Sequence, residues 1–408
     1  MKKNIRTILH YCRRVVLIIS KGVTAVIPKD NNLILFTAWF AQKYSDSSMY
    51  QYEYMLENSK YKVKWYTKNR VIYNELKKSN KPVVYAYSFQ GIYAHLRAKM
   101  LVSSVQFSDY NAFLTGNCIL FDLDHGYPIK EGHFQQKEAG QRGKTYEYIV
   151  RWNVQYYMSA SSLFCMEKVK DCFEIDPSKI VFCNKPRIDT LFDPNLRKGK
   201  NQIVEDKRRG KKVVVWMPTH RSCGNEEINV EEILDLPMIN EICFKNNFVF
   251  FIKKHFYHKN EVSNLDGFQN IFDITNEDID TQTLLYQADI LVTDYSACYI
   301  DYLVLDRPII LYAYDLENYL KTERSLYLKF EDNNVGSKVK TKGEFSDTLE
   351  KMTLDWKDSE HADGRNQIRL RYFDKMVEIG SSRAKVQSII DMLMNDRYTF
   401  DWSDLKRK

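Results

Sequence analysis

Residues 288–315 read ADILVTDYSACYIDYLVLDRPIILYAYD, and this stretch decides the fold class. Within it, 290–292 is a short apolar run flanked by polar residues, which is typical of a buried strand. A polar turn at 293–296 leads into 297–305, where apolar residues recur at helical spacing. A second apolar run follows at 309–312. The order of strand, helix and strand predicts a β-α-β unit, which belongs to a parallel sheet.

The polar turn of this unit is predicted at the carboxyl end of its first strand. Open α/β sheets bind ligands at that edge. The first backbone N–H groups of a new helix also attract phosphate. Asp294 or Ser296 can equally act as an ordinary cap of the helix. Taken alone, the turn leaves both interpretations open.

The composition indicates a globular protein of two domains. A chain of 408 residues, 44% of them hydrophobic, is long for a single core. The formal charge of +7 is a modest excess that favours an anionic substrate or an acidic membrane surface. No nucleic-acid motif is present, so we expect no nucleic-acid partner. The eight cysteines form no CxxC pair, which favours a reducing cytosol. We expect neither a metal site nor a cofactor.

The first 30 residues form a basic amphipathic segment. Its apolar run at 15–20 is too short to span a bilayer, and no convincing cleavage site for a signal peptide follows. A helix lying on an anionic membrane fits this pattern, and the alternative is a first helix packed on its own domain. The apolar face and the basic remainder consist of Ile5, Ile8, Leu9, Cys12, Val15, Val16 and Ile19, and of Lys2, Lys3, Arg6, Arg13, Arg14 and Lys21.

Further along, strand patterns alternate with helical ones, which predicts two doubly wound parallel sheets. The segment 197–212 is crowded with Lys and Arg and has little apolar periodicity, so we interpret it as the linker. We expect an N-terminal domain at 31–200 and a C-terminal domain at 205–375. The final segment, 376–408, is expected to be a helix that packs back on the first domain.

Three strands predicted in the second half end in polar residues. The carboxyl ends of parallel strands share one edge of a sheet, so these residues should form one patch. Arg221 can contact a phosphate with two N–H groups, and Lys253 or Lys254 can add charge. A single histidine is more often structural, but together the strand ends favour an anionic-ligand site. They are Thr219, His220 and Arg221; Lys253, Lys254 and His255; and Thr293, Asp294 and Ser296.

The first half contributes one comparable strand end, His125-Gly126. The glycine allows close approach of a ligand, and a neutral imidazole can take a proton from a hydroxyl nucleophile. A base on one domain and an anion site on the other suggest group transfer from an activated donor. The dinucleotide and P-loop motifs GxGxxG and GxxxxGK[ST] are absent from the sequence.

Several stretches, in order, carry a family resemblance that spans roughly residues 33–385. The sequence resembles the CDP-glycerol glycerophosphotransferases, the primases and polymerases of teichoic acid. The stretches are YSDSSMYQYEYML at 44–56, DHGYPIK at 124–130, PRIDTLF at 186–192, MPTHR at 217–221, IKKH at 252–255 and TDYSACYIDYLVLDRPIILYAYDLENY at 293–319.

The resemblance implies an α/β fold of GT-B type, with two Rossmann-like domains facing a cleft. It implies that an acceptor hydroxyl attacks the β-phosphate of a CDP-polyol and that CMP leaves. His125 resembles the catalytic base, and His255 resembles a second catalytic histidine at the donor phosphates. The residues expected to bind the donor are Thr219, Arg221, Lys253, Asp294, Ser296 and Ala297.

The same resemblance implies the partners. They are a CDP-glycerol or CDP-ribitol donor, an undecaprenyl-linked glycan or polymer of the cell wall or capsule, and the cytoplasmic face of the membrane, where the protein would be peripheral. Whether the protein forms a homo-oligomer is left open. Three positions depart from the family pattern: Asp124 replaces an aromatic residue, Asn184 a glycine and Ala297 a serine.

Two other functions fit the same pattern. The first is a sugar-nucleotide glycosyltransferase of the GT-B fold, which would release a nucleoside diphosphate such as UDP instead of CMP. The second is a catalytically silent scaffold at the membrane, which would bind no CDP-polyol. The presence of His125, Arg221 and His255 argues against the scaffold.

Overall fold

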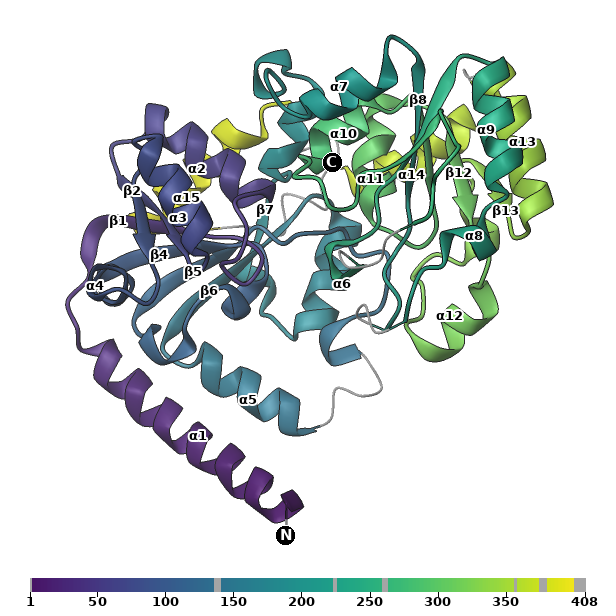
Figure 1. The fold of residues 1–408 in the computed structure, drawn as a ribbon. Coiled ribbons are helices and arrows are strands. Elements are labelled where there is room, and N and C mark those ends of the chain that lie inside the picture. The colour runs from purple at the N-terminus through teal and green to yellow at the C-terminus, as the bar shows by residue number, and fades with distance from the viewer. Residues whose placement is uncertain are drawn as a thin grey trace. The chain divides into compact units, whose positions relative to one another are not determined.

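The computed structural model describes residues 2–135, 141–222, 226–258, 263–355, 358–373 and 380–399. The chain forms two compact units, each built around one sheet (Figure 1). The first unit comprises Met1–His125, His133–Arg187 and Met376–Lys408, and the second comprises Gly126–Gly132 and Ile188–Lys375. Of the C-terminal segment expected at 376–408, residues 376–379 and 400–408 lie outside the described residues.

The sheet of the first unit has seven parallel strands in the order β3-β2-β1-β4-β5-β6-β7. The order reverses between β1 and β4, which makes their carboxyl ends the topological switch point. The strands are β1 (Asp30–Phe36), β2 (Lys62–Thr67), β3 (Val83–Tyr85), β4 (Ala98–Ser103), β5 (Cys118–Asp122), β6 (Val154–Ala160) and β7 (Ile180–Phe182).

Three helices of the first unit begin at recognisable side-chain caps. Asn69, Ser88 and Ser162 accept hydrogen bonds from the first backbone N–H groups of the helices that follow them. The helices of the first unit are α1 (Lys2–Ala25), α2 (Asp46–Asn58), α3 (Arg70–Lys78), α4 (Phe89–Arg97), α5 (Gln141–Arg151), α6 (Leu163–Phe173) and α15 (Ser382–Met394).

The C-terminal helix α15 packs on α2 of the first unit. The side chain of Gln51 in α2 donates a hydrogen bond of 3.2 Å to the carbonyl of Arg383. Gln387 in turn donates one of 2.6 Å to the carbonyl of Asn58. Val386 and Ile390 of α15 are buried, so an apolar stripe holds the helix in place.

Helix α1 lies beside α5 (Figure 1) and packs on the unit through one face. Leu17 and Lys21 are fully buried there. The ammonium of Lys21 donates to the carbonyls of Thr115, at 2.8 Å, and of Val150, at 2.6 Å. Burial lowers the pKa of Lys21 to about 8. Lys21, expected among the basic residues that surround the apolar face, is therefore an anchor to the domain. The outward face instead carries the apolar residues Tyr11, Val15, Val16, Ile19 and Val23.

The second sheet has six parallel strands in the order β10-β9-β8-β11-β12-β13. Its switch point lies between β8 and β11, which pair in register from Ile290 with Val214 to Thr293 with Met217. The strands are β8 (Lys212–Met217), β9 (Phe248–Ile252), β10 (Ile271–Asp273), β11 (Ile290–Thr293), β12 (Ile309–Tyr312) and β13 (Ser337–Val339).

On one side of this sheet α9 and α13 lie next to each other (Figure 1). Strand side chains such as Phe250, Val292 and Ile310 form a buried core with Ile239 of α9 and Phe345 of α13. The helices of the second unit are α7 (Gln202–Arg208), α8 (Val230–Ile233), α9 (Leu236–Lys245), α10 (Thr281–Gln287), α11 (Cys298–Tyr302), α12 (Leu316–Thr322), α13 (Lys342–Leu354) and α14 (Ala362–Tyr372).

Both sheets confirm the predicted doubly wound α/β architecture and the β-α-β unit β11-α11-β12. Two features were not expected. The units divide between Arg187 and Ile188, upstream of the basic segment 197–212. The segment Gly126–Gly132 follows β5 in the chain but belongs to the second unit. Among the described helices, none is both long enough and apolar enough to cross a bilayer.

Candidate active site

His125 is the last residue of the first unit before the chain passes into the second. It follows β5, next to Ser104 at the end of the neighbouring strand β4. Its side chain is 43% exposed. The carboxyl ends of strands near a switch point are where open α/β sheets place ligand-binding groups. The position of His125 therefore suits a group that meets a substrate.

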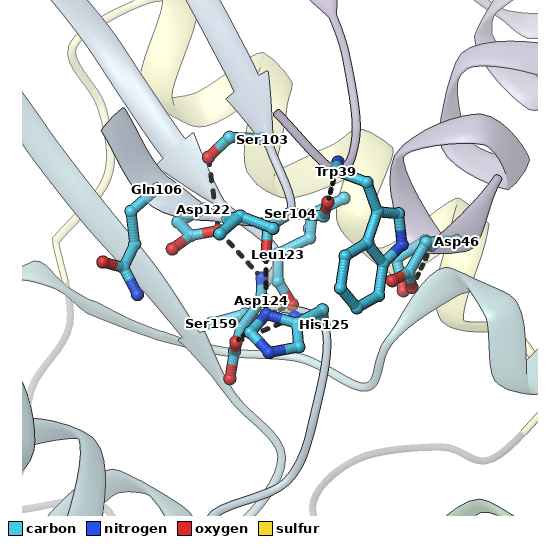
Figure 2. Close-up of polar contacts among 12 residues, drawn as sticks. Trp39, Asp46, Ser103, Ser104, Gln106, Asp122, Leu123, Asp124, His125 and Ser159 are labelled. Carbon is cyan, nitrogen blue, oxygen red and sulfur yellow. Dashed lines mark hydrogen bonds and ion pairs between the residues drawn. The ribbon is translucent and has the colours of Figure 1, made fainter. Parts of the chain in front are cut away.

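The surroundings of His125 assign its tautomer. Its Nδ1 atom lies 3.2 Å from the carbonyl oxygen of Ser104 and 3.3 Å from Oδ1 of Asp124. Both oxygens accept hydrogen bonds, so the proton belongs on Nδ1. The lone pair is then on Nε2, which is the nitrogen that can act as a base. Figure 2 shows the imidazole beside Asp124 and the indole of Trp39.

A strained turn positions the aromatic side chain that lies beside His125. Residues 39–41 have φ values between 49° and 61° although none is glycine. Such backbone conformations cost about 1 kcal/mol or more each and persist where the surroundings enforce them. The buried carboxylate of Asp109 accepts the N–H of Phe40 at 2.5 Å. As a result the indole of Trp39 is held with its ring centre 5.0 Å from that of His125.

Asp124 is ionised beside the imidazole. Burial opposes its charge, but Lys185, His125 and Arg187 outweigh burial and lower the pKa of Asp124. Lys185 lies 3.7 Å from Oδ2, and Arg187 donates to the carbonyl of His125 at 2.9 Å. Burial, together with the charge of Asp124, raises the pKa of Asp122 well above its usual value. Asp124 is thus the carboxylate of this pair that can stabilise a protonated imidazole of His125.

In the second unit Asp294 joins the ends of β8 and β11. Its carboxylate accepts the backbone N–H of Thr219 at 2.9 Å and the hydroxyl of Thr219 at 2.6 Å. It also accepts its neighbour's N–H, from Tyr295, and one N–H of Arg221 at 2.9 Å. Asp294 is 2% exposed. The structure therefore gathers Thr219, Arg221 and Asp294 into one network at the switch point.

The guanidinium of Arg221 is enclosed by acceptors. It donates to Asp315 from Nε at 2.6 Å and from Nη2 at 2.9 Å, and to the carbonyl of Thr219 from Nη1 at 2.5 Å. Burial opposes its charge, but Asp294 and Asp315 more than offset burial, and the pKa of Arg221 is raised. The bidentate contact that we expected with phosphate is made with Asp315 in this structure.

The remaining donor-site candidates occupy adjoining turns. The ammonium of Lys253 donates to three backbone carbonyls after β10, those of Ile274, Thr275 and Glu277, at 3.0 to 3.3 Å. Ser296 accepts the N–H of Cys298 at 3.4 Å. Ala297 is the residue before α11, a helix of only five residues, so the helix dipole behind it is small.

His255 follows β9 and lies against a second histidine. The ring centre of His255 is 4.9 Å from that of His220 and 4.7 Å from that of Tyr257. Nδ1 of His255 accepts the N–H of Tyr257 at 3.4 Å. This assigns the proton to Nε2, the opposite of His125. Such a histidine can donate a hydrogen bond from Nε2 to an anion.

A cavity of about 410 Å³ adjoins Arg221 in the second unit. Its wall carries both acidic and basic side chains, which can accept hydrogen bonds from a polar ligand and donate hydrogen bonds to it. The polar lining consists of Arg221, Glu226, Glu227, Asn229, Glu232, Tyr312, Tyr314, Asp315, Lys340 and Lys342.

Several residues of these sites were missed by sequence reasoning. Trp39 and Ser104 follow the two strands at the first switch point, and that topological position is the signal that could have identified them. Asn184, one of the departures from the family pattern, is buried with no partner for its amide among the described residues. Asp315 and Lys130 belong to stretches quoted for the resemblance, but nothing local marks their long-range contacts.

Comparison with known proteins identifies the family. The model of the CDP-Glycerol:Poly(glycerophosphate) glycerophosphotransferase family matches residues 20–390. The teichoic acid glycerol-phosphate transferase of Staphylococcus aureus is 26% identical over 79% of this chain and 84% of that protein. The ribitol-phosphate polymerase TarL of the same species is 29% identical over 49% of this chain. This match spans only 38% of TarL, and the match to the polymerase TarK spans 41% of that protein.

Solved structures agree on the fold. The wall teichoic acid polymerase TagF superposes with a TM-score of 0.72 at 20% identity, over 97% of this chain and 99% of that chain. A putative UDP-N-acetylglucosamine 2-epimerase from Listeria monocytogenes has the more distant TM-score of 0.55 at 12% identity, over 90% of this chain and 98% of that one. These likenesses confirm the GT-B type of fold. With the family model covering most of the sequence, the chain belongs to the CDP-glycerol:poly(glycerophosphate) glycerophosphotransferase family.

Proposed function

We propose that the protein transfers glycerol phosphate, or ribitol phosphate, from a CDP-polyol to a hydroxyl group of a lipid-linked glycopolymer and releases CMP. The family match supports this donor class, and its relatives include both glycerol-phosphate and ribitol-phosphate enzymes. The observation that carries the proposal is the pair of acceptor oxygens at Nδ1 of His125, which leaves Nε2 as the basic nitrogen of a half-exposed side chain.

In the proposed step the acceptor oxygen forms a bond to the β-phosphorus of the donor. The bond from that phosphorus to the oxygen bridging the two phosphates breaks, and CMP leaves with its electron pair. The acceptor's proton passes to Nε2 of His125. CMP needs less help as it leaves, because a phosphate monoester, with a second pKa of about 6, is a stable anion near neutrality. General-base assistance therefore belongs to the acceptor.

Asp124 supports this role for His125. As the imidazole accepts a proton it becomes positively charged, and an ionised carboxylate 3.3 Å from Nδ1 stabilises that charge. The same neighbour keeps the proton on Nδ1 before the reaction. An acidic residue where the resemblance leads us to expect an aromatic side chain is thus compatible with the proposed chemistry.

The second unit is proposed to hold the donor. His255 can donate a hydrogen bond from Nε2 to a phosphate oxygen, since its Nδ1 accepts the N–H of Tyr257. Thr219, Arg221 and Asp294 hold the strand ends that carry the site, with Ser296 and Ala297 in the turn after β11 and Lys253 bracing the turn after β10. A hydrogen bond of this kind stabilises the negative charge that develops on the phosphate in the transition state.

The acceptor and the location are part of the same proposal. An undecaprenyl-linked acceptor would be reached at the cytoplasmic face of the membrane, where α1 can contact lipid. The exposed apolar face of α1, with Val15, Val16 and Ile19 each at least 55% exposed, supports peripheral attachment. The adjoining Arg13 and Arg14 favour an anionic surface.

A donor panel tests the proposed function. The purified chain is titrated with CDP-glycerol, CDP-ribitol and UDP-sugars, and nucleotide release is then measured with a polyprenyl diphosphate-linked glycan as acceptor. We expect binding of a CDP-polyol and release of CMP in an amount equal to the polyol phosphate transferred. Release of UDP from a UDP-sugar would instead show a glycosyltransferase. Failure to bind any of these nucleotides would point to the scaffold.

A further inference from the structure

The segment Gly126–Gly132 brings a further lysine to the second unit. The carbonyl of Ile129 accepts the N–H of Tyr327 at 3.0 Å, and the N–H of Glu131 donates to the carbonyl of Ser325 at 2.9 Å. Lys130, between these two bonds, forms an antiparallel bridge with Leu326. The backbone on both sides of Lys130 is therefore fixed to the stretch that follows α12.

This pairing directs Lys130 to the network around Asp294. Its Nζ atom lies 5.6 Å from the ring centre of Tyr319, and the guanidinium of Arg221 lies 5.1 Å from the same ring. Tyr319 stacks on Tyr295, the residue after Asp294, with ring centres 4.0 Å apart. Lys130 thus reaches the switch point of the second sheet from a segment encoded in the first half of the chain.

The start of the same segment touches the turn after β11. A Cβ atom added to Gly126 would lie 3.8 Å from the Cβ of Ala297, which is ordinary contact distance. Tyr127 packs against Phe373 with ring centres 5.4 Å apart. The segment is therefore held at its start, beside Ala297 and Phe373, and in its middle, by the stretch after α12.

Lys130 differs from Arg221 and Lys253 in how its charge is used. Arg221 is ion-paired with Asp294 and Asp315, and the ammonium of Lys253 donates to three carbonyls. The ammonium of Lys130 has no hydrogen bond or ion pair with any part of the chain that the structure describes, and it lies 5.6 Å from the ring centre of Tyr319. It is the cation of the three whose charge stays uncompensated by a direct partner.

The charge distribution around Lys130 favours an anion. Burial lowers the pKa of Lys130 to about 8; Asp294 partly offsets this effect, and Arg324 and Arg221 add to it. Burial also lowers the pKa of the nearby His220 to about 4, and Lys130 contributes to that shift. A diphosphate placed here would relieve the repulsion among these cations and restore the full charge of Lys130.

We propose that Lys130 binds the diphosphate of the nucleotide donor. It supplies the positive charge at this site, because Arg221 and Lys253 are engaged with groups of the protein itself. This inference takes the identity of the nucleotide from the proposed function. The presence of a diphosphate does not depend on it. It also gives the Gly126–Gly132 segment a role, because the stretch that begins next to His125 carries the group that holds the donor.

The test compares Lys130→Met with Lys130→Arg in the full chain. Lys245→Met is the matched control, because Lys245 is an exposed lysine of the same unit that pairs with Glu241 on α9. Binding of CDP-glycerol, CDP-ribitol, pyrophosphate and cytidine is measured by isothermal titration at two ionic strengths. Thermal unfolding checks that each variant is folded.

We expect Lys130→Met to weaken binding of the CDP-polyol and of pyrophosphate by about 10- to 100-fold, the usual worth of a hydrogen bond to a charged group. The dependence of binding on salt should also fall. Cytidine affinity should stay unchanged, Lys130→Arg should recover part of the loss, and Lys245→Met should match the wild type.

Equal affinity of wild type and Lys130→Met for a bound CDP-polyol would overturn the inference and leave the proposed function standing. If the wild type binds pyrophosphate in a Lys130-dependent way but no CDP-polyol, the inference holds and the proposed donor is wrong. Equal loss of cytidine and diphosphate binding in Lys130→Met would assign the lysine to the fold of the site and contradict the inference. Absence of binding to every probe would overturn both.

Discussion

Nη2 of Arg221 donates a hydrogen bond of 2.9 Å to Oδ2 of Asp294, and both side chains are almost completely buried. Removing one member of such a pair leaves an uncompensated charge, which typically costs about 3–5 kcal/mol. We therefore expect Arg221→Ala to lower the free energy of unfolding by about that amount, because Asp294 and Asp315 would both lose their partner. Urea unfolding followed by circular dichroism measures the change.

The matched control is Arg208→Ala. Arg208 pairs with Glu205 at 2.8 Å, but both side chains are about one-third exposed, so the loss should be within about 1 kcal/mol. If Arg221→Ala unfolds like the wild type but no longer binds the donor, the arginine contacts the donor directly and the structural role is wrong.

Asp124→Asn should slow turnover by about tenfold or more while donor affinity stays close to that of the wild type. The amide cannot offset the positive charge that His125 gains, and its NH₂ group can place the proton on the wrong nitrogen. Asp171→Asn, on the exposed side of α6, is the control. Turnover of Asp124→Asn equal to that of the wild type would exclude Asp124 from the catalytic step.

How much of the structure can be predicted from the sequence depends on how far apart in the chain the interacting residues lie. The strands β5, β8, β9 and β11 were found because each is a short apolar run ending in polar residues, and parallel topology then places those ends on one edge. These are local patterns combined with one general rule.

The remaining features depend on contacts between residues far apart in the chain. Arg221 looked available for phosphate, yet Asp315 and Asp294 occupy its N–H groups. Lys21 was grouped with the basic residues around the apolar face, yet its ammonium donates to the carbonyls of Thr115 and Val150. The pairing of Ile129 and Glu131 with the stretch after α12 has no periodic signal of its own.

Donor binding should weaken as the pH rises through about 8. The pKa of Lys130 in the free protein is about 8, so its ammonium is charged below that pH and loses its charge above it. The diphosphate of a CDP-polyol stays fully ionised throughout, so the enzyme alone changes charge. Titration between pH 7 and pH 9.5 should show the loss in the wild type and no such loss in Lys130→Met.

Other charged groups around Lys130 do not produce this change. Burial raises the pKa of Cys298 to about 11 and lowers that of His220 to about 4, so both titrate outside the measured range. The remaining charged neighbours are Asp294, Arg221 and Arg324. A wild-type affinity that stays constant up to pH 9.5 would argue against a charged Lys130 at the diphosphate.

Replacing Val15, Val16 and Ile19 with serine should release the protein from vesicles of anionic phospholipid. These side chains lie on the exposed face of α1, whereas Leu17 and Lys21 keep the helix on its domain. Losing three apolar side chains should weaken binding by about tenfold or more, and salt should weaken the binding of the wild type. Leu354→Ser, an exposed apolar position of the second unit, is the control. Co-sedimentation equal to that of the wild type would leave α1 with a structural role only.

The most direct test of the central claim separates donor binding from proton transfer in two variants, His125→Ala and His255→Ala. Each is titrated with the CDP-polyol that binds, and its CMP release is measured with a lipid-linked acceptor. We predict that His125→Ala keeps donor affinity and loses about 10²- to 10⁴-fold in turnover, the usual worth of a general base, and that His255→Ala loses both affinity and turnover. Loss of donor binding in His125→Ala with retention in His255→Ala would invert the two roles, and full activity of both variants would contradict the account.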